Sequence, residues 1–207
     1  MDFEKIMHRL EGHNLKEKRD ERYRSYGILI PLVMLEEQIH ILFEVRSLEL
    51  RNQPGEICFP GGHVDPDDLS PMDAAIRETS EELGIPLHTI QNVKPLDYSV
   101  QHAAGRIIYP FVGIITDPSK IQANPSEVKE TFMVPLDYLL NIEPEMHSIH
   151  FQVIPDKNFP FHLIPGGENY QWKTTDMKEY FYFYKDYCIW GLTAAILRDF
   201  LMLINET

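Results

Sequence analysis

Three glutamates lie at helical spacing in one segment of the chain, and they are the residues best suited to chemistry. Glu78, Glu81 and Glu82 would share one face of a helix, because positions i, i+3 and i+4 are neighbours on its surface. Like charges at this spacing cost roughly 0.2–0.5 kcal/mol per pair, and the helix dipole disfavours anions near the C-terminal end. A bound cation would remove both penalties. Carboxylate oxygens without a nearby cysteine or paired histidine favour hard ions, so the pattern predicts Mg²⁺ or Mn²⁺; an acidic solvent-exposed face is the alternative.

The helix that carries these glutamates has recognisable ends. Ser70 is a good N-cap, Pro71 suits the first helical position, and Gly84 ends the segment. Glu82 lies nearest the apolar stripe on a helical wheel, so we expect it to be the least solvated of the three glutamates. The stripe itself, which should face the core, consists of Met72, Ala75, Ile76, Thr79 and Leu83.

A glycine-containing turn precedes this helix, and together the two resemble a known family. Residues 77–85 (RETSEELGI) resemble the core of the Nudix box, the signature of hydrolases that cleave diphosphates linked to another moiety. Residues 59–62 (FPGG) resemble its usual entry, where glycine lets the backbone approach a ligand closely. The box departs from the common form in two ways. The stretch before Arg77 is one residue longer, and Asp68 stands at the position of an early glutamate.

The residues upstream resemble one subgroup more closely. Arg46-Ser47, Arg51, Gly55 and FPGG fit the pattern R-S-x3-R-x3-G-x3-F-P-G-G, which resembles the signature of coenzyme A pyrophosphatases. Glu44 stands where that signature prefers threonine. Two later segments, at 124–128 and 190–193, also resemble this subgroup.

Strands mixed with two clear helices indicate an α/β or α+β fold, and the resemblance implies a Nudix-like α/β/α sandwich with a mixed central sheet. We expect a peripheral N-terminal arm over residues 1–25 and a catalytic domain over 26–207. Helices are predicted at 70–84, 135–140 and 190–204. Strands are predicted at 28–35, 39–45, 93–100, 107–115, 130–134, 149–154 and 180–184.

The resemblance also implies roles for individual residues. Glu78, Glu81 and Glu82 would be metal ligands, with the Gly61 carbonyl oxygen as a backbone ligand. Arg77 would pair with a carboxylate of the box and orient it. Asp68 would then have a structural role.

Further acidic and basic residues complete the expected site. Many family members add a carboxylate from a later loop, for which Glu127 is the first candidate and Glu130 the alternative. Glu82, Glu81 and Glu127 all qualify as the general base, and their spacing does not order them. Arg46 and Arg51 would either hold their loop in place or bind substrate phosphates, including the 3′-phosphate of coenzyme A.

The function that the resemblance implies is metal-dependent hydrolysis of coenzyme A, or its derivatives, to 3′,5′-ADP and 4′-phosphopantetheine. One alternative is a Nudix pyrophosphatase acting on ADP-ribose, NADH or a dinucleoside polyphosphate. A second is a non-catalytic module that senses a nucleotide. Such modules commonly lose carboxylates of the box, whereas this chain has all three.

Composition limits the partners. The 207 residues include 19 Lys and Arg against 32 Asp and Glu, a formal charge of −13, which argues against broad binding to nucleic acid or anionic membranes. Two cysteines form no disulfide framework, and neither a signal peptide nor a membrane-spanning run is evident, so we expect a cytoplasmic protein. A homodimer is predicted, with the N-terminal arm or residues 159–177 as the contact.

Overall fold

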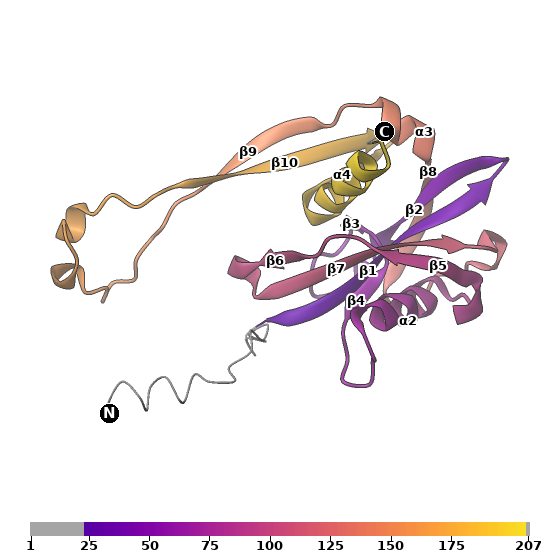
Figure 1. The fold of residues 1–207 in the computed structure, drawn as a ribbon, viewed down its shortest axis with the longest axis horizontal. Helices are drawn as coiled ribbons and strands as arrows, with labels where there is room; N and C mark the ends of the chain where they lie inside the picture. The colour runs from indigo at the N-terminus through magenta and orange to yellow at the C-terminus, as the bar shows by residue number, and fades with distance from the viewer. Residues whose placement is uncertain (1–22, 206–207) are drawn as a thin grey trace, which may run out of the picture.

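A mixed β-sheet passes through the centre of the computed structural model, which describes residues 23–205 (Figure 1). Its central strand, β1 (Arg24–Leu35), pairs in parallel with β7 (Arg106–Ile115) and antiparallel with β2 (Gln38–Arg46). The strand order is β3-β2-β1-β7-β5, and β4, β6 and β8 pair with β1, β7 and β2. These remaining strands are β3 (Ile57–Cys58), β4 (Gly61–His63), β5 (Ile90–Pro95), β6 (Ser99–Gln101) and β8 (Val128–Pro135).

Helices cover both faces of this sheet. Helix α2 (Pro71–Leu83) lies on one face and α4 (Gly191–Asn205) on the other, with the short α3 (Leu136–Asn141) after β8 (Figure 1). Two apolar cores result, because each helix buries its own stripe against one side of the strands. The expected α/β/α sandwich with a mixed central sheet is confirmed.

Local signals determine where α2 begins and ends. The Ser70 hydroxyl oxygen accepts a hydrogen bond from the Asp73 backbone N–H at 3.2 Å, as an N-cap should. Gly84 adopts a left-handed conformation with φ of 62°, and its N–H donates to the Ser80 carbonyl. The predicted helix boundaries are therefore those of the structure.

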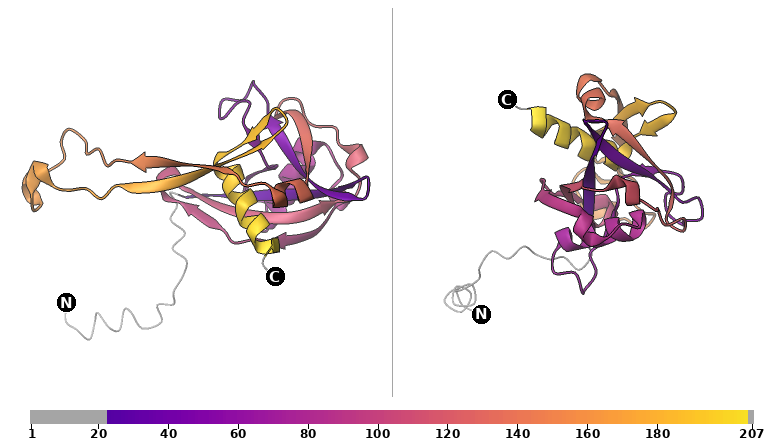
Figure 2. Two further views of the ribbon diagram at one scale, coloured as in Figure 1. Left: turned by 90° about the horizontal axis from the view of Figure 1, so that it is seen from above. Right: turned by 90° about the vertical axis from the view of Figure 1, so that its right-hand side faces the viewer.

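A two-stranded arm extends away from the sandwich (Figures 1 and 2). It consists of β9 (Glu145–Phe151) and β10 (Thr175–Tyr184), which pair antiparallel, and β11 (Tyr187–Ile189) returns the chain to the body. Every residue of β9 is exposed, so its sequence carries no alternation from a buried face. For this reason β9 lies earlier in the chain than the strand predicted at 149–154. Elsewhere, the strand predicted at 93–100 is divided between β5 and β6.

Short 3₁₀ turns connect several of these elements. They comprise η1 (Leu87–Thr89), η2 (His102–Ala104), η3 (Pro118–Lys120), η4 (Phe161–Leu163) and η5 (Gly167–Asn169). Most of the predicted N-terminal arm, residues 1–22, lies outside the described residues, and β1 already begins at Arg24. Within residues 23–205, none of the helices combines the length and apolar character needed to span a bilayer.

Candidate active site

A pocket of about 560 Å³ lies where the second half of α2 meets the turn at 59–62 and the start of α4. Acidic and basic side chains gather on its wall, which favours a charged ligand over an apolar one. The charged residues of the lining are Arg46, Glu56, Glu78, Glu82, Arg106 and Glu127.

Glu82 is the most deeply placed glutamate of α2. Only 6% of the residue is exposed, whereas the side chain of Glu81 is 56% exposed, as the helical wheel predicts. Its Oε2 accepts a hydrogen bond from the Gly61 N–H at 2.8 Å, which ties the helix to the glycine turn. Burial raises the pKa of Glu82 well above its usual range, and the nearby charge of Glu44 adds to this effect.

Glu78 lies directly against the glycine turn. A Cβ added at Gly62 would be 2.3 Å from the Glu78 carboxyl carbon, so this position requires glycine for the side chain to lie where it does. Desolvation raises the pKa of Glu78, although Arg77 opposes the shift. The turn and the helix therefore place two partly desolvated carboxylates, those of Glu78 and Glu82, on one pocket wall.

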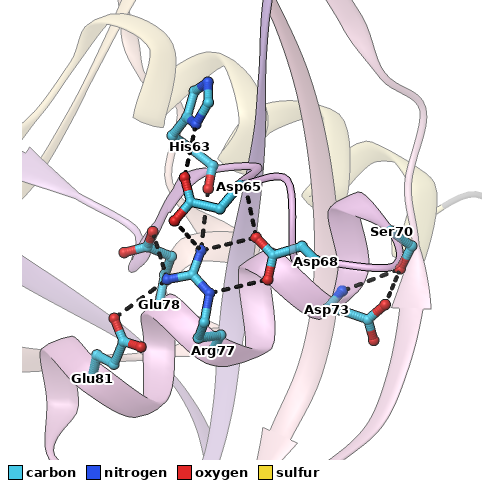
Figure 3. Close-up of polar contacts among 8 residues, drawn as sticks. All are labelled: His63, Asp65, Asp68, Ser70, Asp73, Arg77, Glu78 and Glu81. Atoms are coloured by element: carbon cyan, nitrogen blue, oxygen red, sulfur yellow. Dashed lines mark hydrogen bonds and ion pairs between the residues drawn. The ribbon is translucent and has the colours of Figure 1, made fainter.

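Arg77 connects the acidic residues of α2 to the loop that precedes the helix (Figure 3). Its guanidinium group donates two hydrogen bonds to Asp68, at 3.0 and 2.9 Å. It also bonds Glu78 at 3.0 Å and Glu81 at 3.3 Å. The hydrogen bonds from Arg77 lower the pKa of Asp68, and those interactions raise the pKa of Arg77. Asp68 thus fixes Arg77, which in turn holds two glutamates of the box.

The other expected site residues divide into two groups. Glu127, Arg46 and Gly61 line the pocket together with Glu78 and Glu82. Besides Arg77, two predicted residues lie outside the described lining. Glu81 points toward solvent beside Arg77, and Arg51 is exposed on the loop between β2 and β3.

Glu44 is the acidic residue that sequence reasoning did not assign to the site. It lies on β2 and is only 1% exposed. Its Oε1 accepts a hydrogen bond from the Cys58 thiol at 3.3 Å, while its buried Oε2 has no hydrogen-bond partner. Burial raises the pKa of Glu44 to about 7. The available signal was a carboxylate within the apolar run ILFEV, at the position where the resembled signature prefers threonine.

The donor set around the pocket fits a hard divalent cation. Across residues 23–205, no three His, Cys, Asp or Glu side chains converge closely enough to form a ready-made metal site. Glu78 and Glu82 nevertheless line the same pocket as Gly61, and burial raises the pKa of both carboxyl groups, that of Glu82 well above its usual range. Oxygen donors of this kind suit Mg²⁺ or Mn²⁺.

Comparison with known proteins agrees with this geometry. The family model for the NUDIX domain matches residues 26–157. Peroxisomal coenzyme A diphosphatase NUDT7 of Mus musculus is 39% identical over 118 residues, which cover 56% of this chain. That match spans about half of the mouse protein, 49% of its length. The uncharacterized Nudix hydrolase NudL of Photorhabdus laumondii is 31% identical over 179 residues, covering 85% of this chain and 82% of the relative.

One solved structure supports the fold alone. The MutT/nudix family protein from Enterococcus faecalis superposes with a TM-score of 0.51 at 14% sequence identity. The match covers 100% of this chain and 71% of that protein.

Proposed function

The chain belongs to the Nudix hydrolase family and is a diphosphatase, and we propose that its substrate is coenzyme A or a coenzyme A derivative. Hydrolysis of the diphosphate would release 3′,5′-ADP and 4′-phosphopantetheine, or its acylated form.

The observation that carries the substrate assignment is the convergence of separate segments on one pocket. The segments that resemble coenzyme A pyrophosphatases lie far apart in the chain. In the fold they meet, because Arg46, Glu127 and the start of α4 at 190–193 all line the pocket that contains Glu78 and Glu82. Residues of a subgroup signature that surround one cavity are better explained by a shared ligand than by unrelated structural needs.

In this proposal, Glu78, Glu82 and the Gly61 carbonyl hold the divalent cation. Glu81 stays outside the pocket lining, hydrogen-bonded to Arg77. The cation supplies neutralisation of the diphosphate charge and activation of the attacking water. Arg46 lines the pocket, and we assign it to bind a phosphate oxygen there, because a guanidinium group suits phosphate. Arg51, which lies outside the lining, is left with a role in its loop.

The position of the side chains reduces the number of candidates for the general base. A general base must reach the reacting atoms, and only Glu82 and Glu127 of the three predicted candidates line the pocket. Catalysis would then depend mainly on positioning and electrostatics, as is usual for transfer of phosphoryl groups.

The assignment is tested by incubating the full chain with Mn²⁺ and coenzyme A and separating the products. We expect 3′,5′-ADP and 4′-phosphopantetheine in equal amounts, with no turnover when EDTA is present. Parallel reactions with ADP-ribose, NADH and a dinucleoside polyphosphate test the alternative substrates. Turnover of one of these without 3′,5′-ADP from coenzyme A would overturn the substrate assignment, and absence of turnover with all of them would favour a nucleotide-sensing module.

We further infer that residues 26–207 form the catalytic unit and that two copies associate in a cytoplasmic homodimer, without nucleic acid or membrane partners. The arm of β9 and β10 carries the 159–177 region predicted as the contact, and it extends from the body where a second chain could reach it (Figure 2). Light scattering coupled to size exclusion would give a mass of two chains if this inference holds and one chain if it fails.

A further inference from the structure

The direction of Glu44 is determined by the strand that carries it. Successive side chains of a strand point to opposite faces of its sheet. On β2, Leu42 packs into the core beneath α2, whereas Phe43 and Val45 pack into the core beneath α4. Glu44 therefore points to the same face as Leu42, which is the face from which α2 presents Glu82.

The surroundings of Glu44 do not compensate its charge. Its register partner on β3 is Cys58, whose thiol satisfies Oε1 and which also lines the pocket. The ionisable groups that act on Glu44 electrostatically are Arg46, Glu127 and Glu82. Arg46 is the one cation among them, and no hydrogen bond joins it to Glu44; its own Nε is unpartnered.

A buried carboxylate oxygen without a partner is costly. Leaving a buried polar group unsatisfied typically costs about 1–3 kcal/mol, and more when the group is charged. Glu44 has this defect next to two further carboxylates, and threonine, the residue that the resembled signature prefers, would not create it. A cation that contacts Oε2 would remove the defect and offset the neighbouring charges of Glu44 and Glu82.

We propose that Glu44 is an additional ligand of the divalent cation, bound through Oε2 beside Glu82. This inference rests on the proposed function, since it concerns the metal site assigned there. It gives this chain one more anionic ligand than a chain with threonine at the same position, and so predicts tighter binding of the cation.

The test is Mn²⁺ titration of the full chain, followed by the loss of the electron paramagnetic resonance signal of free Mn²⁺. Glu44→Gln keeps the shape and removes the charge, and Glu44→Thr introduces the residue of the signature. We expect both variants to bind Mn²⁺ at least tenfold more weakly than the wild type, while the exposed control Glu143→Gln stays within twofold. Unfolding in EDTA should occur at the same or a higher temperature in Glu44→Gln, because an uncompensated charge has been removed.

Mn²⁺ binding by Glu44→Gln within twofold of the wild type would overturn the inference. That result would mean that Glu44 stays protonated and does not bind the cation, so that an amide replaces it without loss of Mn²⁺ affinity. If Glu44→Thr fails to fold, Glu44→Gln alone decides. Coenzyme A hydrolysis combined with unchanged Mn²⁺ binding in Glu44→Gln would refute the ligand and leave the proposed function standing. If the wild type does not hydrolyse coenzyme A but Glu44→Gln binds Mn²⁺ more weakly, Glu44 is supported as a metal ligand and coenzyme A is refuted as the substrate.

Discussion

Helices α2 and α4 cover opposite faces of the same sheet and bury different kinds of side chain. In α4 the buried residues are apolar except for Thr193, and they include Leu197 and Phe200. In α2 the buried set contains Glu82, and the last turn has no basic residue to offset its acidic end. One helix therefore stabilises the sandwich by apolar burial, whereas the other holds charge where charge is unfavourable.

The difference indicates where stability and function are separable. A helix built like α4 lowers the free energy of the folded chain without a ligand. The acidic end of α2 recovers its cost only if a cation binds there, so its charges should matter to activity more than to folding. The following predictions test this contrast between α2 and α4.

The largest effect is expected for Glu82→Gln on α2. The variant keeps the shape and the acceptor for the Gly61 N–H but loses the charge. Coenzyme A turnover should fall about a thousandfold, the scale typical of losing one preorganised electrostatic contact in an active site. Initial rates with Mn²⁺ provide the measurement, and Glu143→Gln provides the matched control. Turnover within tenfold of the wild type would remove Glu82 from the site.

Leu197→Ala on α4 should produce the opposite result. Leu197 is fully buried, so its truncation should lower the free energy of unfolding by roughly 2–5 kcal/mol. Turnover per folded molecule should remain unchanged, because the side chain does not line the pocket. Urea unfolding and rates measured well below the transition are the readouts. Lost turnover in a fully folded variant would contradict the separation of the two helices.

The free energy of unfolding should depend on pH through the buried carboxyl groups on the α2 side of the sheet. Folded Glu44 has a pKa of about 7, raised from 4.5 by burial. At pH values below 4.5 it is protonated in both states, and between 4.5 and 7 the unfolded chain loses the proton first. In EDTA, the free energy of unfolding should therefore fall as the pH rises through this window, by at most about 3 kcal/mol from this group. Glu44→Gln should reduce the slope, with the raised pKa values of Glu78 and Glu82 leaving a remainder, and an unchanged slope in that variant would show that other groups cause it.

The smallest effect is expected at Asp68, which contacts the site only through Arg77. Asp68→Asn keeps the size but removes the charge that pairs with the guanidinium. We expect kcat to fall about tenfold to a hundredfold with little change in KM, since Arg77 would hold Glu78 and Glu81 less firmly. Asp68→Glu should recover part of kcat. A changed KM with unchanged kcat would instead assign Asp68 to substrate binding.

The sequence predicts α2 well because its determinants are local. The cap at Ser70, the ending at Gly84 and the low exposure of Glu82 follow from residues within a few turns of one another. The two-faced covering of the sheet follows from element order and the family resemblance. Both kinds of information are present in the chain before any tertiary contact is known.

The features that sequence reasoning missed depend on contacts between distant segments. Glu44 is buried because β2 pairs with β3 on one side and β8 on the other, which no local pattern specifies. Proline has no N–H to donate and is therefore disfavoured inside a central strand. Pro31 nevertheless lies within the central strand β1, between the residues that pair with β4 and those that pair with β2. The full length of the arm was not predicted, because β9 and the first four residues of β10 are exposed and carry no alternating pattern; the strand predicted at 180–184 coincides with the half-buried end of β10.

The central claim, that the acidic end of α2 and the glycine turn form a divalent metal site, is tested most directly by crystallography with Mn²⁺. We predict an anomalous peak in the pocket, about 2.0–2.3 Å from carboxylate oxygens of Glu78 and Glu82. A crystal soaked in saturating Mn²⁺ that shows no peak at these residues would contradict the account. Mn²⁺ bound only elsewhere on the protein would contradict it as well.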